Sequence, residues 1–185
     1  MKQGASAARG ELERLIHAHE AFAWLAIEVL DDASVPAEAK VPLAAAAHYG
    51  AEVLDLIPDE LPAYGLVDDL FVLALGLEAA FEADSATQAR YAERELQGHS
   101  LREQLRSMRE RFYGFWEFCR QQTAGFFEAF REAARRDGAA VRAAREELAG
   151  SLERIARATA GVRLREEDVR SFLPRFRAFR PEDLA

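Results

Sequence analysis

The chain has 185 residues, of which half are hydrophobic and 30% are charged, and its formal net charge is −8. A chain of this length and composition can bury one sizeable core, so an intrinsically disordered protein is excluded. The single cysteine excludes an intramolecular disulfide and favours a reducing compartment.

No stretch of the sequence has the length of a membrane-spanning helix. The longest nearly pure apolar run covers residues 70–77, far short of the ~20 residues that a spanning helix needs. The first residues are charged throughout and lack the apolar segment of a signal peptide. We therefore predict a cytoplasmic protein, with a peripheral position on a membrane face as an open alternative.

Charge is distributed unevenly along the chain. Residues 1–85 contain four basic and 16 acidic residues, a net charge of −12, whereas residues 86–185 contain 20 arginines and 16 acidic residues, a net charge of +4. The two halves can attract each other, or the basic half can face an anionic partner. Because the arginines alternate with glutamates, we favour attraction within the molecule.

The N-terminal part predicts two helices. Over residues 11–32, apolar residues recur every three or four positions, which indicates an amphipathic helix. Trp24 adds apolar surface on another face, so we expect this helix to have neighbours on more than one side. Ser34 and Pro36 mark the start of a second helix, which continues to about Ile57. Its alanine-rich middle predicts a close approach to neighbouring helices.

The second helix leads into an apolar helical hairpin. Pro58 and Pro62 end it, because the residue before a proline avoids the helical region, and Gly65 allows the chain to turn back. Residues 66–81 then predict a third helix, antiparallel to the second.

The second half of the chain predicts a long helical hairpin. Residues 87–136 contain no proline, which predicts one long helix or two helices broken near a glycine. A further helix follows the turn at Asp137 and Gly138, and a short C-terminal helix ends before Pro174. No alternating strand pattern is found. Together these elements predict an all-α fold with two units, a helical unit at 1–84 and a long antiparallel helical hairpin at 85–185.

A heptad-like apolar seam follows the first helix of this long hairpin. Such spacing is typical of a coiled-coil-like surface, which packs in a core or in self-association. The aromatic residues that we assign to this interaction seam are Phe112, Phe115, Trp116, Phe126 and Phe130.

The connection inside the first hairpin carries a distinctive motif. An Asp-x-Ile-Pro-Asp segment is followed by a second proline, a glycine and an Asp-Asp pair before the apolar helix. The motif residues are Asp55, Pro58, Asp59, Pro62, Gly65, Asp68 and Asp69. Over about residues 36–78 the chain resembles the DUF1232 family, also called YkvA-like proteins. The resemblance implies an apolar helical hairpin, which some membrane-associated proteins contain, and it implies no established reaction.

The acidic residues of the motif allow two interpretations. They can cap exposed amides and complement helix dipoles, which we favour. Alternatively, carboxylates that converge at the hairpin can bind a hard cation such as Mg²⁺ or Ca²⁺, or act as a catalytic acid and base. The residues of this alternative metal site are Asp55, Asp59, Asp68 and Asp69. We predict no cofactor and assign no catalytic residue.

Other catalytic signatures are missing from the sequence. It contains no Glu-x-x-His, no His-Glu-x-x-His and no glycine-rich phosphate loop. The four histidines are interpreted as surface or interhelical residues. Cys119 lies on the apolar seam, so we predict a small buried hydrophobic side chain.

These observations favour a non-enzymatic interaction or scaffold protein. In this hypothesis the hairpin at residues 49–78 is the docking element, and the aromatic helix packs or self-associates. The predicted partner is a protein or a second copy, with an anionic membrane surface as a further option. Net negative charge opposes nucleic-acid binding. The rival hypothesis is a metal-dependent hydrolase that uses the acidic residues of the hairpin.

Overall fold

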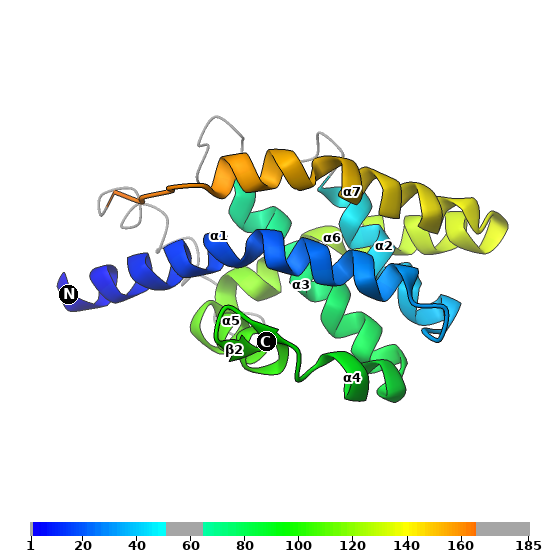
Figure 1. Cartoon of the computed structure of the whole chain (residues 1–185), viewed down its shortest axis with the longest axis horizontal. Coiled ribbons are helices and arrows are strands. Elements are labelled where there is room, and N and C mark those ends of the chain that lie inside the picture. The colour runs from blue at the N-terminus through cyan, green and yellow to red at the C-terminus, as the bar shows by residue number, and fades with distance from the viewer. Residues whose placement is uncertain (1, 51–64, 166–185) are drawn as a thin grey trace.

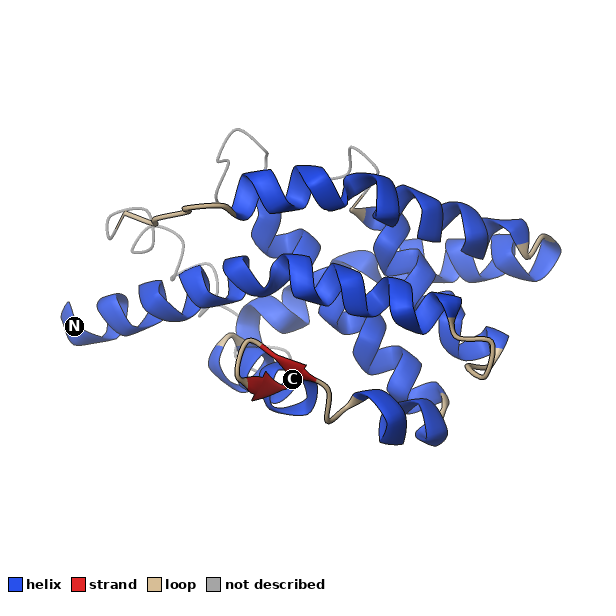
Figure 2. Ribbon diagram, in the orientation of Figure 1, coloured by secondary structure: helices blue, strands red, loops and turns tan. Residues whose placement is uncertain are grey.

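The computed structural model of the chain describes residues 2–50 and 65–165. Within these ranges it contains seven helices and one small two-stranded sheet, which confirms the predicted all-α fold (Figures 1 and 2). The helices are α1 (Lys2–Asp31), α2 (Ala37–Tyr49), α3 (Gly65–Ala83), α4 (Ser85–Tyr91), α5 (Leu101–Arg111), α6 (Tyr113–Arg136) and α7 (Ala139–Thr159). The strands are β1 (Glu95–Leu96) and β2 (His99–Ser100).

Helices α2 and α3 form an antiparallel pair at the centre of the fold. Gly50 lies beside Asp69, and Ala46 lies beside Gly76, so the residue number rises along one helix as it falls along the other. A Cβ atom at Gly76 would lie only 2.6 Å from the Cβ atom of Ala46. The alanine-rich stretch of α2 therefore allows the close approach that the sequence predicted. Residues 70–77 of α3 contain no polar side chain and are buried all round, as expected for a helix surrounded by others.

Helices α1 and α7 cover one side of this pair. In Figure 1, α1 crosses the front of the molecule, and α7 lies along it. The two run antiparallel, because Arg145 near the start of α7 pairs with Asp31 at the end of α1. Just beyond the other end of α7, the Leu164 amide donates to Glu13 at 2.8 Å.

Residues 87–136 do not form the continuous helix, or the pair of helices, that the sequence predicted. Helix α4 ends at Tyr91, and a small hairpin follows in which Gln97 and Gly98 both have positive φ angles. Such a pair is the signature of a two-residue turn that joins antiparallel strands. Ser100 then starts α5 with a capping box that involves Glu103, a Ser-x-x-Glu signal that is visible in the sequence.

A second interruption separates α5 from α6 at Phe112, two residues before Gly114. Phe112 leaves the helical region with φ −120° and ψ 35°, and it is the cap residue of both helices. Its side chain is buried and contacts the ring of Phe71 on α3. Tertiary packing of this ring, for which sequence periodicity has no signal, coincides with the break.

The buried side chains form one hydrophobic cluster that extends from Leu12 to Leu164. The predicted boundary between residues 84 and 85 falls at Asp84, whose carboxylate accepts a hydrogen bond from the Thr87 amide and caps α4. Side chains from both sides of this boundary share the cluster. The predicted short C-terminal helix lies outside the described residues.

Candidate functional site

The carboxylate of Asp68 is more buried than that of Asp69, the other acidic motif residue that the structure describes. Asp68 lies in the first turn of α3, and its side chain is fully buried. The hydroxyl of Tyr49, the last residue of α2, donates a hydrogen bond to it at 3.2 Å. This bond joins the facing ends of the two hairpin helices, so Asp68 holds the hairpin together at the end where its connection begins.

Asp69, the next residue, lies at a small cavity where four helices meet. The cavity has a volume of about 10 Å³, and it is lined from α1 by His19, from the end of α2 by Gly50, from α3 by Asp69 and from α7 by Ser151 and Arg154. Space of this size holds about one water molecule. The arrangement therefore offers polar groups from four helices but no room for an organic substrate.

Arg154 closes the end of α2 at this cavity. Its guanidinium donates a hydrogen bond to the carbonyl oxygen of Gly50 at 3.0 Å. Gly50 is the C-terminal cap of α2, where carbonyl groups lack helical partners and a cation is favourable. Arg154 therefore links α7 to the DUF1232-like hairpin through a charge that the sequence analysis did not select.

His19 is a buried histidine on the same cavity. Its side chain is 2% exposed, and within the described residues its Nδ1 atom has no hydrogen-bond partner. Burial, followed by the positive charge of Arg154, lowers the pKa of His19 to about 4. The imidazole is therefore neutral at physiological pH. It is an interhelical residue, which is one of the two positions that the sequence predicted for the histidines.

Cys119 behaves as the sequence predicted. The thiol is buried on α6, and burial together with the negative charge of Asp68 raises its pKa well above the usual value. A thiol held in its neutral form is a poor nucleophile. This geometry supports a packing role for Cys119.

The motif, and with it the alternative metal site of Asp55, Asp59, Asp68 and Asp69, is only partly within the described residues. Asp55, Pro58, Asp59 and Pro62 lie outside them, whereas Gly65 begins α3, and Asp68 and Asp69 occupy its first turns. Within residues 2–50 and 65–165, no three His, Cys, Asp or Glu side chains are grouped so that they could hold a metal ion. The described acids instead contact Tyr49 and line the small cavity.

Tyr49→Phe tests the bond at the end of the hairpin. We expect the free energy of unfolding to fall by about 1–3 kcal/mol, because a buried hydrogen bond is lost while its carboxylate stays buried. Urea denaturation followed by circular dichroism measures the change. Tyr113→Phe is the control, since the Tyr113 ring is exposed. Equal stability of the two variants would show that the Tyr49 bond contributes nothing.

The aromatic seam of α6 is an internal packing surface. Phe112, Phe115, Trp116 and Phe130 are buried, and Phe126 is half-buried. Their contacts are with the hairpin: Phe71 of α3 lies 4.9 Å from Phe115 and 6.1 Å from Trp116 between ring centroids, and the ring of His48 on α2 stacks on Phe126 at 5.9 Å. The seam residues therefore pack against the hairpin of the same chain. This arrangement corresponds to the core interpretation and leaves little of the seam for a second copy.

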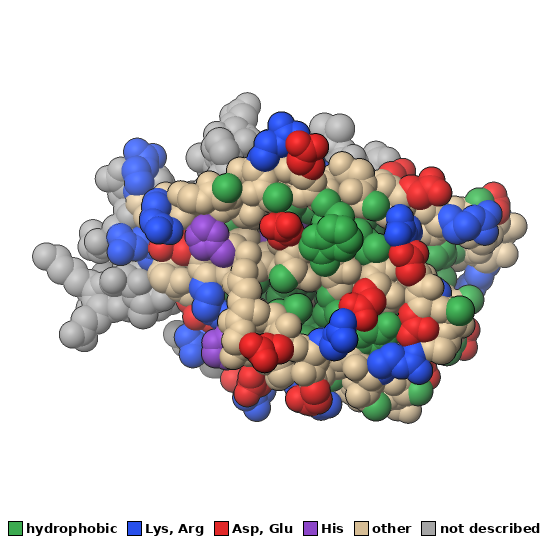
Figure 3. Space-filling model, in the orientation of Figure 1, with side chains coloured by type: hydrophobic (Ala, Val, Ile, Leu, Met, Phe, Trp, Pro, Cys, Tyr) green, Lys and Arg blue, Asp and Glu red, His purple; other side chains and the backbone are tan. Residues whose placement is uncertain are grey.

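An open groove beside α1 is a surface feature that the sequence did not reveal. Its volume is about 1020 Å³, and it lies between α1, the end of α4, β1 and α7. Trp24 lines it and is 56% exposed, although the sequence predicted a packing neighbour for this face of the helix. Leu25 and Ile27 beside it are buried. Figure 3 shows apolar side chains in the middle of this face, surrounded by acidic and basic ones.

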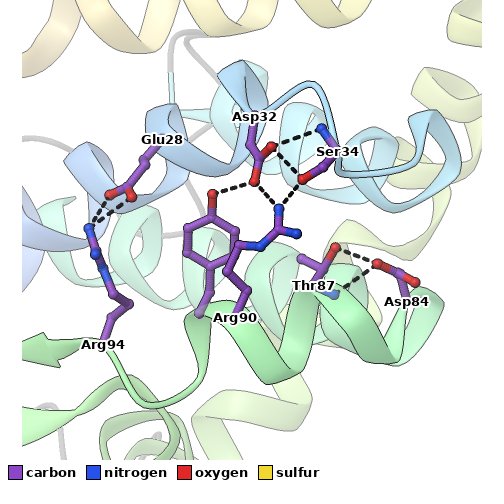
Figure 4. Close-up of polar contacts among 8 residues, drawn as sticks. Glu28, Asp32, Ser34, Asp84, Thr87, Arg90 and Arg94 are labelled. Carbon is purple, nitrogen blue, oxygen red and sulfur yellow. Dashed lines mark hydrogen bonds and ion pairs between the residues drawn. The ribbon is translucent and has the colours of Figure 1, made fainter.

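Ion pairs hold the walls of this groove together. Arg94 donates to both oxygens of Glu28, at 2.8 and 2.7 Å (Figure 4). Asp32 at the end of α1 accepts hydrogen bonds from the hydroxyl of Tyr91, at 2.8 Å, and from Arg90. Hydrogen bonds from Ser34, with those from Tyr91 and Arg90, lower the pKa of Asp32. These contacts attach α4 and its following segment to α1.

Comparisons with known proteins bear on the hairpin alone. No curated protein and no solved structure was found to match the chain. Residues 39–75 match the family model described as "Protein of unknown function (DUF1232)", which confirms the resemblance over this segment. In the described part of the chain, no helix is both long enough and apolar enough to cross a membrane. The match falls at the centre of the fold, because it includes most of α2 and the first part of α3.

Proposed function

We propose that the chain is a non-enzymatic helical interaction protein that binds a partner protein through the groove beside α1. The observation that carries this proposal is Trp24, a large aromatic side chain that is 56% exposed on a helix whose neighbouring positions are buried. Exposed aromatic residues in a concave surface are typical of binding hot spots.

Burial of the described part of the hairpin supports placing the contact surface on α1. Its apolar residues Leu70, Phe71 and Val72 are fully buried, and Leu73 and Ala74 are at most 2% exposed. Docking through these side chains would require the surrounding helices to separate. A docking role for the hairpin at residues 49–78 would therefore rest on residues 51–64, which lie outside the described part. In our proposal the described hairpin supports the other helices, and α1 provides the contact surface.

A catalytic role has less support from the described residues. The cavity beside Asp69 and His19 has room for about one water molecule, and burial keeps the Cys119 thiol neutral. The hydrolase alternative needs Asp55 and Asp59, which lie outside the described residues. We therefore assign the chain no catalytic residue and no cofactor.

Photo-crosslinking in cells that produce the protein tests the interaction. A benzophenone amino acid is placed at position 24 in one variant and at position 113 in a control, because Tyr113 is the other exposed large hydrophobic residue described. We expect a discrete adduct with one polypeptide from position 24 and none from position 113. The adduct partner, once purified, should bind the wild-type chain in a saturable titration that Trp24→Glu abolishes.

Two results would contradict the proposal. One is equal adduct formation from both positions, which indicates random collision. The other is recovery of the whole chain with vesicles of phosphatidylcholine and phosphatidylglycerol in a flotation assay, without any protein adduct. That result would place the chain on a membrane face, the alternative that the sequence left open.

A further inference from the structure

We propose that the groove beside α1 binds a short amphipathic helix whose apolar face covers Trp24 and whose remaining side chains are basic. This inference rests on the proposed function and names the chemistry of the partner. Three features of the groove carry it: its length, the apolar residues along its floor and the excess of carboxylates on its rim.

The length of the groove suits a helix of about three turns. Its floor follows α1 from Ala21 to Asp32, a span of roughly 16 Å at the rise of an α-helix. A partner helix of three turns has the same length. The alternative of adding a strand to β1 is poor, because β1 has two residues and already pairs with β2.

The floor provides an apolar strip for the partner. Ala21, Trp24, Leu25, Ile27 and Leu96 line the groove, and of these only Trp24 is largely exposed. A helix lying in such a groove contacts it with residues three and four positions apart. Trp24 is then the residue that loses most water on binding, and it forms the centre of the contact.

The charges of the rim select a basic partner. Four carboxylates line the groove, those of Glu28, Asp31, Asp32 and Glu95, against the two guanidinium groups of Arg94 and Arg145, a net charge of −2.

The rim arginines leave part of this negative charge uncompensated. Arg94 and Arg145 pair with Glu28 and Asp31, and Arg90 pairs with Asp32. Three of the four rim carboxylates are therefore paired, and the charge of Lys40 also acts on Asp31. Glu95 has no ion pair among the described residues. Complementary charge therefore favours a cationic segment near Glu95 and disfavours anionic lipid headgroups.

Tryptophan fluorescence provides a direct test. The chain has two tryptophans, and Trp116 is 1% exposed, so a change in exposure at the surface is reported by Trp24. The probe is a synthetic peptide of 14 residues with leucines at helical spacing on one face and lysines on the other. We expect a saturable blue shift of the emission and protection of Trp24 from acrylamide quenching.

Matched variants distinguish binding of the peptide in the groove from nonspecific binding elsewhere on the protein. Because Trp24→Ala removes the reporter, its affinity is measured by the anisotropy of a fluorescein-labelled peptide. We expect the affinity to fall at least about 30-fold, as for the loss of a central aromatic hot spot. Tyr113→Ala should leave the affinity unchanged. Glu95→Gln should weaken binding several-fold and reduce its salt dependence.

Any of the following results would contradict the inference. A peptide with glutamates in place of lysines that binds equally well shows that charge does not select the partner. A blue shift with phosphatidylcholine–phosphatidylglycerol vesicles but not with the peptide identifies a membrane contact. A blue shift that depends on protein concentration, with dimers in light scattering, identifies a second copy. If the crosslink at position 24 appears but the peptide does not bind, the proposed function stands and this inference fails.

Discussion

Gly76→Ala is expected to destabilise the protein by about 1–3 kcal/mol, the cost of overpacking a tight core. A Cβ atom at this position would lie 2.6 Å from the Ala46 Cβ, 3.1 Å from the Pro42 carbonyl oxygen and 3.2 Å from the Leu43 Cα. Attractive carbon contacts lie at about 3.5–4.0 Å. These atoms are backbone or the first side-chain carbon of α2, so none can rotate away. The two central helices would have to separate.

The direction of the stability change in Gly76→Ala distinguishes overpacking from helix propensity, because alanine is a better helix former than glycine. In an exposed helix, replacing glycine with alanine stabilises by about 1 kcal/mol. Gly125 in α6 and Gly150 in α7 have open space around their Cβ positions, so Gly125→Ala and Gly150→Ala are expected to show that gain. Gly76→Leu, with a larger side chain, should cost more than about 3 kcal/mol or prevent folding. Urea unfolding of the set measures all four changes.

A stabilising Gly76→Ala would contradict the close contact between α2 and α3. It would mean that the hairpin helices lie farther apart than described. The set distinguishes these outcomes because every alanine variant carries the same gain in helix propensity. The Gly76→Ala variant differs from the controls Gly125→Ala and Gly150→Ala in that its new Cβ atom meets α2.

The stability of the protein is expected to fall by up to about 3 kcal/mol as the pH decreases from 6.5 to 4. The cause is His19, whose pKa is about 4 in the folded chain against 6.5 for the unfolded reference. Above pH 6.5 the imidazole is neutral in both states and contributes nothing. Between these values the unfolded chain binds the proton that the folded chain excludes, so stability decreases with falling pH. Below about pH 4 both states are protonated, and the loss is complete.

His19→Leu is expected to remove this pH dependence. Leucine has no proton to bind and leaves no buried nitrogen without a partner, so stability at pH 7.5 should be equal or higher. His99→Gln is the matched control, because His99 is exposed on β2. The difference in unfolding free energy between wild type and His19→Leu, measured in urea at several pH values above 4.5, isolates the contribution.

Other groups near His19 do not mask the result. Asp69 and Arg154 line the same cavity, and both remain in the variant. Elsewhere in the chain, Glu11, Asp31, Asp32 and Asp84 have lowered pKa values and also reduce the stability as the pH falls, whereas the raised pKa of Glu78 acts in the opposite direction. All five groups are common to both proteins. A pH dependence that persists unchanged in His19→Leu would show that another group is responsible.

Local sequence patterns were sufficient to predict that the first half contains three helices, but not all of their bounds. Helix α1 begins at Lys2, before the predicted residue 11, and α2 ends at Tyr49 and not near Ile57. The apolar spacing of α1, the start of α2 after Ser34 and Pro36, and the polar start of α3 follow from short-range rules of capping and periodicity. The family resemblance depends on the same kind of short, spaced motif. The burial of Cys119 was also predictable, because its position on the apolar seam is a local property.

The interruptions of the second half were harder to predict. The Gln97–Gly98 turn and the Ser100 capping box have local signals, but the surrounding helical periodicity outweighed them. The break at Phe112 lies two residues before Gly114, but its exact position coincides with the packing of the Phe112 ring against Phe71, a residue far away in the sequence.

Composition, helical periodicity and one short motif in the sequence were enough to predict a helical protein with a hairpin that resembles the DUF1232 family. Only the tertiary structure showed that the aromatic seam packs on this hairpin, that His19 and Arg154 meet beside Asp69, and that Trp24 remains exposed. The physical reason is the range of the interactions. Capping and periodicity act within a few residues, whereas burial depends on which helices lie side by side, and that choice is made by packing across the whole chain.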